Sequence, residues 1–307
     1  MSLKWAARVA FGLLLIASLL YRFDTGTIFS TILSAKVGYL LLAASAYAVT
    51  FLILSSRWRM ILASMGEKLP VATAYQAFAG GMIISDLTPG RIGEFARPIL
   101  VKDRVDLSRG MASVAIDRYS DILTTFFLGL FGMLLLAGRI AHLALAVIFI
   151  LLIVVCSLAF WFKRPFFLKL IDRFSTTGWG TARLSEIAHS LDRALNEVAD
   201  IKVLMIKSVL ITASAWIFHA LRIVLIAKSV GFDAPLYMLF LLQPLVSALA
   251  LVPVTVSGLG LVEGGLAALL AGVGIPAASG ISIALMDRAI TVAFHILVGG
   301  RLAAKSI

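Results

Sequence analysis

The chain has 307 residues, of which 61% are hydrophobic, and its mean hydropathy is +1.03. Soluble globular domains are only about half apolar, so much of this surface must face lipid, which excludes an ordinary soluble enzyme. The net charge of +11 does not indicate a nucleic-acid partner, because the 27 Lys and Arg residues are spread between apolar runs instead of forming one patch. We predict an all-α, polytopic integral membrane protein.

Six segments are apolar enough to cross the hydrocarbon core, which takes about 20 residues of helix. The first resembles a signal peptide, but Tyr21 to Asp24 is not a small-residue cleavage site, so we expect a retained span. Two others, Val37 to Ser55 and Leu143 to Phe162, contain no charge. The predicted spans are 5–21, 37–56, 110–137, 143–162, 207–228 and 278–300.

Two further apolar stretches, 71–100 and 235–274, are interrupted by Pro and Gly clusters at Thr88 to Gly90 and at Pro253 to Gly260. Irregular backbone at membrane depth is tolerated only where protein or a wet cavity covers it. We therefore predict two re-entrant hairpins built from broken helices.

Residues 163–206 form the longest stretch that is predicted to lie outside the membrane. Their apolar residues recur at three- and four-residue steps, which predicts an amphipathic helix at the cytoplasmic surface. Such a helix would either pack against the bundle or rest on anionic lipid. The repeating residues are Leu184, Ile187, Leu191, Leu195 and Val198.

The basic residues predict the orientation. With the N-terminus in the cytoplasm, 18 Lys and Arg residues lie inside and four outside, as the positive-inside rule requires. We therefore predict a multi-pass protein of a bacterial-type plasma (inner) membrane with both termini cytoplasmic. The same count makes the first hairpin enter from the cytoplasm and the second from outside.

The two hairpins share a sequence pattern. In each, the Pro/Gly break leads to a glutamate, Glu94 or Glu263, and an Asp-Arg pair follows 23 or 24 residues later, at Asp117 and Asp287. Opposite entry and a shared pattern predict an inverted repeat, which is typical of secondary transporters. The single membrane domain, 1–307, would then hold a first repeat at about 37–137, the linker at about 163–206 and a second repeat at about 207–300.

Charged residues inside membrane segments need partners or water, because an ionised side chain at the bilayer centre costs about 2.5 to 3.5 kcal/mol on insertion scales. Each Asp-Arg pair has a structural alternative, an ion pair near the interface. The grouping of the charges at the two hairpins nevertheless favours a functional site. These residues are Arg91, Glu94, Arg97, Asp117, Arg118, Asp121, Arg222, Glu263, Asp287 and Arg288.

The first hairpin has the residue types of a phosphate site. Thr88 is expected to cap a helix whose first position is Pro89, leaving free N–H groups beside Arg91 and Arg97.

The second hairpin offers Ser257 as a similar cap, and Gly258 and Gly260 allow close backbone approach. Its charged residue is Glu263, which is expected to bind a cationic group, carry a proton or pair with an arginine of the first hairpin.

No metal or cofactor is predicted. His219 and His295 lie in spans without a second ligand at metal-binding spacing, so we interpret them as packing histidines. The single cysteine, Cys156, builds neither a disulfide nor a metal site. The P-loop and the nucleophile-elbow patterns are both absent from the sequence, so we predict that the chain is not an enzyme.

Three segments, Ser85 to Glu94, Ala115 to Asp121 and Pro253 to Glu263, together resemble the signature of a known family. It is the lysylphosphatidylglycerol synthase transmembrane region family, also called flippase-like or UPF0104-type, and the resemblance covers about residues 5–300. The resemblance implies that, in multidomain relatives, this membrane region moves aminoacylated phospholipid between leaflets, while a separate soluble domain attaches the amino acid. This sequence contains no such domain, so the resemblance implies the transport half alone.

By the match of these motifs, the resemblance implies that seven residues are functional: Arg91, Glu94, Arg97, Asp117, Arg118, Glu263 and Asp287. With the backbone positions of the two breaks and the second Asp-Arg pair, the expected substrate-binding set is Pro89, Gly90, Arg91, Gly93, Glu94, Arg97, Asp117, Arg118, Ser257, Gly258, Gly260, Glu263, Asp287 and Arg288.

The leading hypothesis is a flippase or scramblase-like transporter of a phospholipid or polyprenyl-phosphate lipid. Arg91 and Arg97 would bind the phosphate, and Glu94 and Glu263 would compensate charge or couple protons. One alternative is an intramembrane lipid-modifying enzyme with Asp117 or Glu94 as base. Another is a non-transporting regulator or partner of lipid or cell-envelope synthesis, and a homo-oligomer is compatible with either.

Overall fold

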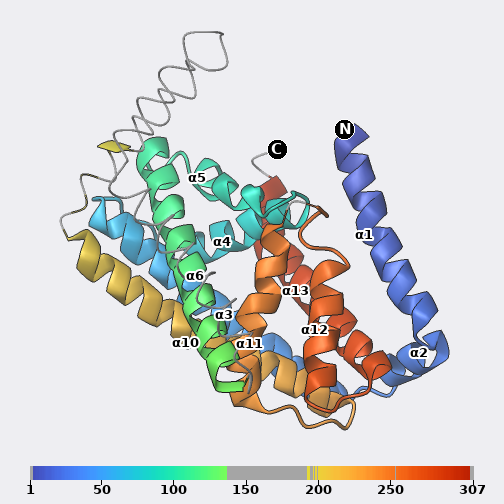
Figure 1. The fold of residues 1–307 in the computed structure, drawn as a ribbon. Coiled ribbons are helices and arrows are strands. Elements are labelled where there is room, and N and C mark those ends of the chain that lie inside the picture. Colours follow the sequence, from blue (N-terminus) through green and yellow to red (C-terminus); the bar gives the residue numbers. More distant parts are fainter. Residues whose placement is uncertain are drawn as a thin grey trace, which may run out of the picture.

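The computed structural model describes residues 3–136, 200–252 and 254–304, together with Asp192, Arg193, Asn196 and Val198. Over these residues the chain is a bundle of helices (Figure 1). Its longer helices are α1 (Leu3–Arg22), α2 (Thr25–Leu33), α3 (Val37–Ser64), α4 (Val71–Asp86), α6 (Leu107–Leu136), α10 (Ile201–Ser229), α11 (Leu236–Ala248), α12 (Leu261–Gly272) and α13 (Ala277–Ala304). The short ones are α5 (Arg97–Leu100) and the 3-10 helices η1 (Ile92–Ala96) and η2 (Leu249–Leu251).

Four helices in the described part of the chain are long and apolar enough to cross a membrane: α1, α3, α10 and α13. They contain the predicted spans 5–21, 37–56, 207–228 and 278–300, although α3 extends to Ser64 and α10 begins at Ile201. The predicted span 110–137 falls on α6. The span predicted at 143–162 and most of the linker at 163–206 lie outside the described residues, although Val198 of that linker is buried against α3 and α6.

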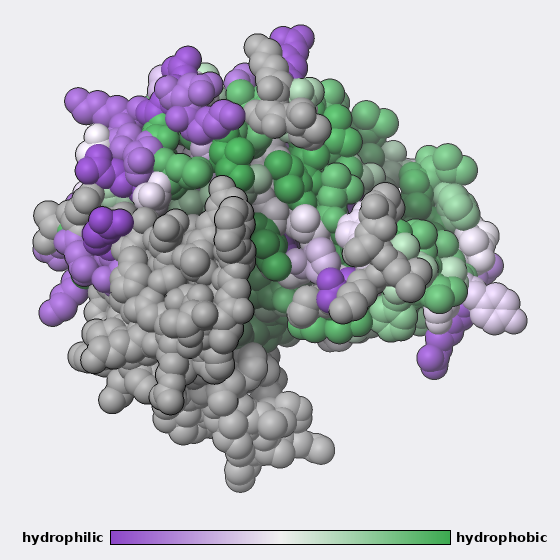
Figure 2. All heavy atoms as spheres, turned by 90° about the horizontal axis from the view of Figure 1, so that it is seen from above, coloured by the Kyte–Doolittle hydropathy of each residue, from purple (hydrophilic) through white to green (hydrophobic). Residues whose placement is uncertain are grey.

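The outer surface of the bundle is apolar. Leu14 in α1 and Leu297 in α13 are 66% and 82% exposed, and other large hydrophobic side chains on α3 and α10 also point outward. Figure 2 views the molecule from above and shows broad hydrophobic patches, with hydrophilic residues gathered toward parts of the edge. Contiguous apolar surface of this extent marks contact with lipid, so the chain is an integral membrane protein.

Both predicted breaks are present, and left-handed backbone produces them. In the first, α4 ends at Asp86, and Gly90 and Arg91 have φ angles of 64° and 57° before η1 begins. In the second, Ser257 and Gly258 have φ angles of 50° and 71° before α12 begins. Because a residue with a Cβ rarely adopts this region, Arg91 and Ser257 occupy strained positions that the surrounding structure must hold.

The two breaks meet in space. Pro89 and Val256 form an isolated antiparallel bridge, and the backbone N–H of Ser257 donates to the carbonyl of Thr88 over 3.3 Å. Segments about 170 residues apart in sequence therefore share one short stretch of β-type pairing within a helical bundle.

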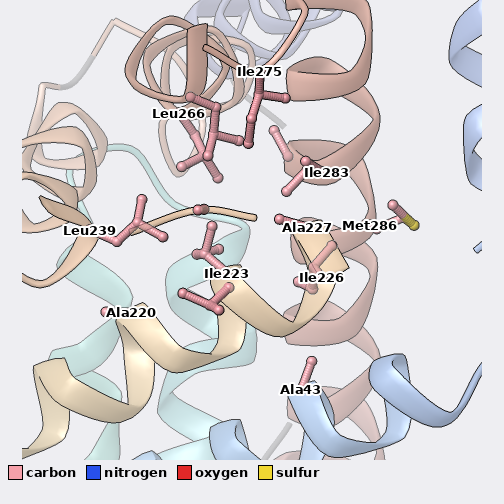
Figure 3. Packing of buried hydrophobic residues seen from close by; sticks show 14 residues of the cluster. Ala43, Ala220, Ile223, Ile226, Ala227, Leu239, Leu266, Ile275, Ile283 and Met286 are labelled. Carbon is pink, nitrogen blue, oxygen red and sulfur yellow. The ribbon is translucent and has the colours of Figure 1, made fainter. Parts of the chain in front are cut away.

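The packing interlocks the two halves of the chain. Helix α4 packs along α13, α11 packs along α6, and α3 packs along α10. Each broken segment therefore lies against the last helix of the other half, and α6 and α13 run in opposite directions in Figure 1. A buried apolar cluster joins α3 to the second half (Figure 3); its labelled members are Ala43, Ala220, Ile223, Ile226, Ala227, Leu239, Leu266, Ile275, Ile283 and Met286.

Candidate functional site

A cavity of about 170 Å³ lies where the two broken segments meet, and helices of both halves line it. Its aromatic lining includes Tyr47, Phe51, Phe78 and Trp216. Its polar lining includes Asp86, Arg91, Glu94, Arg118, Asp121, His219, Arg222, Gln243, Glu263, Asp287, Arg288 and His295.

Arg57 anchors the charges of the first half. It lies within α3, is fully buried, and donates from Nε to Asp117 Oδ1 over 2.8 Å. It also bonds Asp121 in α6 and Thr212 in α10. The predicted span ended at residue 56 and left Arg57 outside it, whereas α3 continues to Ser64 and places Arg57 in the core.

Arg97 is also fully buried, and this corrects its expected role as a phosphate ligand. It pairs with Glu94 and, over 2.7 Å, with Asp117, and its guanidinium carbon lies 3.7 Å from the centre of the Phe78 ring. Arg118 joins the same network by donating to Glu94 over 2.6 Å and by pairing with Asp121. Because two carboxylates neutralise Arg97 within the protein, it does not present a free cation to the cavity.

The second half repeats this arrangement with different residues. Arg222 in α10 pairs with Asp287 in α13 over 2.6 Å, as Arg57 in α3 pairs with Asp117 in α6. Glu263 at the start of α12 pairs with Arg288 over 2.5 Å.

Glu263 also accepts the backbone N–H of Gly260 over 2.7 Å. The expectation that Glu263 would pair with an arginine of the first hairpin is wrong, because Glu263 forms its ion pair with Arg288 of its own half. Its counterpart in the first half is Glu94, which pairs with Arg118.

We call the twelve ionisable residues of this network the charge cluster. It contains Arg57, Arg91, Arg97, Arg118, Arg222 and Arg288, with Asp86, Glu94, Asp117, Asp121, Glu263 and Asp287. Six of the expected charged site residues line the cavity: Arg91, Glu94, Arg118, Glu263, Asp287 and Arg288. Asp117 and Arg97 do not line it, but they pair with each other, and Arg97 also pairs with the lining residue Glu94.

The predicted helix cap at the first break is wrong. Thr88 does accept a backbone N–H, that of Gly93 over 2.9 Å, but Pro89 lies in the bridge and not in a helix. Gly93 has another purpose, since a Cβ on it would lie 2.3 Å from backbone atoms of Ile84 and Ser85. The return of the chain against the end of α4 therefore requires glycine.

The predicted cap at the second break is also wrong. Gly260, not Ser257, precedes α12, and the hydroxyl of Ser257 donates to Asp86 Oδ1 over 3.4 Å. The physical reason is the left-handed turn at Ser257 and Gly258, which directs the chain toward the first break before the helix begins. Ser257 thereby connects the two breaks.

Arg91 is the exception among the four arginines that line the cavity. No ion pair joins it to a carboxylate of the described residues, and its buried Nε has no hydrogen-bond partner there. On the lining of the same cavity, the buried Oε1 of Gln243 likewise lacks a donor. Because an unsatisfied buried polar group costs about 1 to 3 kcal/mol, and more if it is charged, both atoms favour a polar ligand in the cavity.

The sequence interpretation missed a chain of hydrogen bonds beside Arg91. His295 Nδ1 lies 2.6 Å from Asp86 Oδ2, and its Nε2 lies 2.7 Å from the hydroxyl of Tyr47. His295 is thus satisfied, as predicted for a packing histidine, yet it lines the cavity. The available signal was its position seven residues after Arg288, two helical turns on, which places both side chains on one face of α13.

Two comparisons connect this architecture to known proteins. The family model described as the lysylphosphatidylglycerol synthase TM region matches residues 5–299. A UPF0104 membrane protein of the archaeon Pyrococcus horikoshii is 22% identical, and the alignment covers 97% of this chain and 96% of that protein. The match spans both broken segments and both Asp-Arg pairs.

Proposed function

Since the chain belongs to the lysylphosphatidylglycerol synthase TM region family, and since two broken segments meet at a charged cavity, we propose that it moves a lipid with an anionic phosphate head group between membrane leaflets. The head group enters the cavity while the acyl or prenyl tails stay in the bilayer. No chemical step on the lipid is part of this function.

One observation carries the proposal: Arg91 faces the cavity without a carboxylate partner among the described residues. The other lining arginines already have partners, so an arriving anion gains most at Arg91. A phosphate oxygen would accept from Arg91, and a hydroxyl or amine of the head group would donate to Gln243. Hydrogen bonds between ionised groups are about twice as strong as neutral ones, which suits Arg91 as the main anchor.

The size of the cavity supports a head group in preference to a whole lipid. At about 170 Å³ it is well below the roughly 300 Å³ at which pockets begin to enclose drug-sized ligands. The apolar outer surface then provides the environment for the tails.

The matched ion pairs support an inverted repeat in which the two halves exchange conformations. Arg57 with Asp117 corresponds to Arg222 with Asp287, and Glu94 with Arg118 corresponds to Glu263 with Arg288. Repeats of this kind give alternating access when one half rocks against the other around a fixed site. Orientation with both termini in the cytoplasm, in a plasma membrane, belongs to the same proposal.

The test is lipid translocation in proteoliposomes. Fluorescent phosphatidylglycerol and a polyprenyl phosphate are followed separately from the outer to the inner leaflet, so that the two arms distinguish the lipid classes. We expect Arg91→Ala to abolish translocation of the transported class while leaving the thermal unfolding midpoint unchanged. Arg104→Ala, which removes an exposed arginine beyond the same hairpin, is the matched control.

Unchanged translocation in the Arg91→Ala protein would remove Arg91 from the site. Absence of translocation of both lipids by the folded wild-type protein would instead favour a regulator or assembly partner of lipid synthesis.

A further inference from the structure

The hydrogen-bonded chain Tyr47–His295–Asp86 lines the cavity but is not needed to hold a phosphate. It connects three elements: Tyr47 lies in α3, His295 in α13 and Asp86 at the end of α4. The side chain of His295 is 3% exposed and that of Asp86 is 18% exposed. Since Asp86 also accepts from Ser257, the chain extends to the second break.

The charged groups around this chain come from every neighbouring element. From α10, Arg222 lies over the Tyr47 ring, 4.5 Å from its centre, and also contacts His219. From the first break, Arg91 acts electrostatically on Tyr47, and from α13 Asp287 does so too. Arg288 of α13 interacts with Asp86 and pairs with Glu263 of α12.

The formal charge of the cluster depends on this chain. The charge cluster holds six arginines and six carboxylates, so its net charge together with His219 and His295 is zero when both histidines are neutral. One added proton on the pair of His295 and Asp86 makes the net charge +1. A head group with one negative charge would restore neutrality only in that second state.

We propose that Asp86 and His295 form a site for one proton that binds together with the anionic head group. This inference rests on the proposed function, and it places the coupled proton on Asp86 and His295 instead of on Glu94 or Glu263. A net charge is costly in a medium of low dielectric constant, so an anion enters the cavity most favourably when a proton accompanies it.

The hydrogen bonds tolerate both states. With His295 neutral, its Nδ1–H donates to Asp86 and its Nε2 accepts from the Tyr47 hydroxyl, a tautomer assigned from the partners. The proton adds to Nε2, after which both ring N–H groups donate and the Tyr47 oxygen accepts. Because a tyrosine hydroxyl is both donor and acceptor, Tyr47 keeps its contact with His295 in both states, and in the protonated state its hydrogen is available to another acceptor in the cavity.

The structure makes opposite predictions for two near-isosteric variants. Asp86→Asn removes one negative charge permanently and should mimic the protonated state at every pH. His295→Gln retains a polar side chain but cannot become charged, and it should mimic the unprotonated state at every pH.

The experiment measures binding of dihexanoyl phosphatidylglycerol, which carries one negative charge, to the full chain in phosphatidylcholine nanodiscs between about pH 5.5 and 8.5. For wild-type protein we expect affinity to fall as the pH rises, by at most about tenfold per pH unit, which is the limit for one linked proton. Calorimetry in buffers of different ionisation enthalpy should show uptake of up to one proton per lipid. Asp86→Asn should bind tightly and His295→Gln weakly, both without pH dependence.

Three results would overturn the coupling while leaving the proposed function intact: wild-type affinity independent of pH, His295→Gln with the wild-type pH dependence, or both variants shifting affinity in one direction. The calorimetric number of protons taken up per lipid is measured on wild-type protein alone, so it does not depend on whether either variant folds. If wild-type protein binds no anionic lipid at any pH, the proposed function fails, and the coupling fails with it.

Discussion

Arg57 in α3 and Asp117 in α6 form a fully buried ion pair, with 2.6 Å between Nη2 and Oδ1. The second oxygen of Asp117 holds Arg97, the first residue of α5, over 2.7 Å. The carboxylate of Asp117 in α6 therefore links the first broken segment, through Arg97, to α3, through Arg57. Its counterpart, Asp287, forms an ion pair with Arg222 and with no other arginine of the described residues.

Removing one member of this buried pair should destabilise the fold strongly. We expect Arg57→Met to lower the free energy of unfolding by about 3 to 5 kcal/mol, because Asp117 and Asp121 lose a buried partner. Arg59→Met, on the same helix, removes a half-buried side chain whose Nε bonds the Leu69 carbonyl, and should cost about 1 kcal/mol. Unfolding in mixed detergent micelles gives both values, and equal losses would contradict the assigned role of Arg57.

The contact between α4 and α13 should tolerate no side chain at Gly299. A Cβ there would lie 2.3 Å from the backbone nitrogen of Gly80, so we expect Gly299→Ala to cost about 1 to 3 kcal/mol. At the adjacent Gly300 a Cβ meets nothing within 4 Å, and Gly300→Ala should be neutral or stabilise the helix by up to about 1 kcal/mol. Thermal unfolding of the two variants decides between this packing and one in which both residues face lipid.

Linking the two breaks should stop transport. Thr88 and Ser257 lie opposite each other beside the Pro89–Val256 bridge, where hydrogen-bonded antiparallel pairs have Cα atoms about 5.5 Å apart, a spacing that suits a disulfide. In a Cys156→Ser background, we expect Thr88→Cys with Ser257→Cys to lose lipid translocation on oxidation and to regain it on reduction. Each single cysteine variant is the control, and full activity of the oxidised double variant would show that the breaks need not separate.

The inverted repeat predicts that the loops flanking the two hairpins lie on opposite sides of the membrane. Lys102 follows the first hairpin and Asp233 precedes the second, and both are exposed. With Cys156 replaced by Ser, a membrane-impermeant thiol reagent added to intact cells should label Asp233→Cys but not Lys102→Cys. Labelling of both positions from the same side would rule out the inverted arrangement.

The sequence correctly indicated most of the helical organisation in the described residues. An apolar run long enough to cross the bilayer favours a helix whatever surrounds it, so α1, α3, α10 and α13 could be located without their neighbours. The breaks were equally visible, because Pro and Gly act locally on the backbone. The end of α3 was misplaced because a charged Arg57 resembles a loop residue until its partners are known.

The site was predicted in composition but only partly in role. The sequence named the charged residues of both hairpins, yet Arg97 is a buried structural residue, while Asp86 and His295 were not placed in the site. The cap expected at Ser257 failed because the left-handed φ angle there comes from its contact with the other break.

Length, hydropathy and the Pro and Gly positions by themselves determined a membrane bundle with two broken segments, because these properties act over a few residues at a time. Only the tertiary structure decided which charges neutralise one another, since Arg57 lies 60 residues from Asp117 and Asp86 lies 209 residues from His295. Helix packing sets those distances, and the pairing it enforces leaves Arg91 facing the cavity without a carboxylate partner among the described residues.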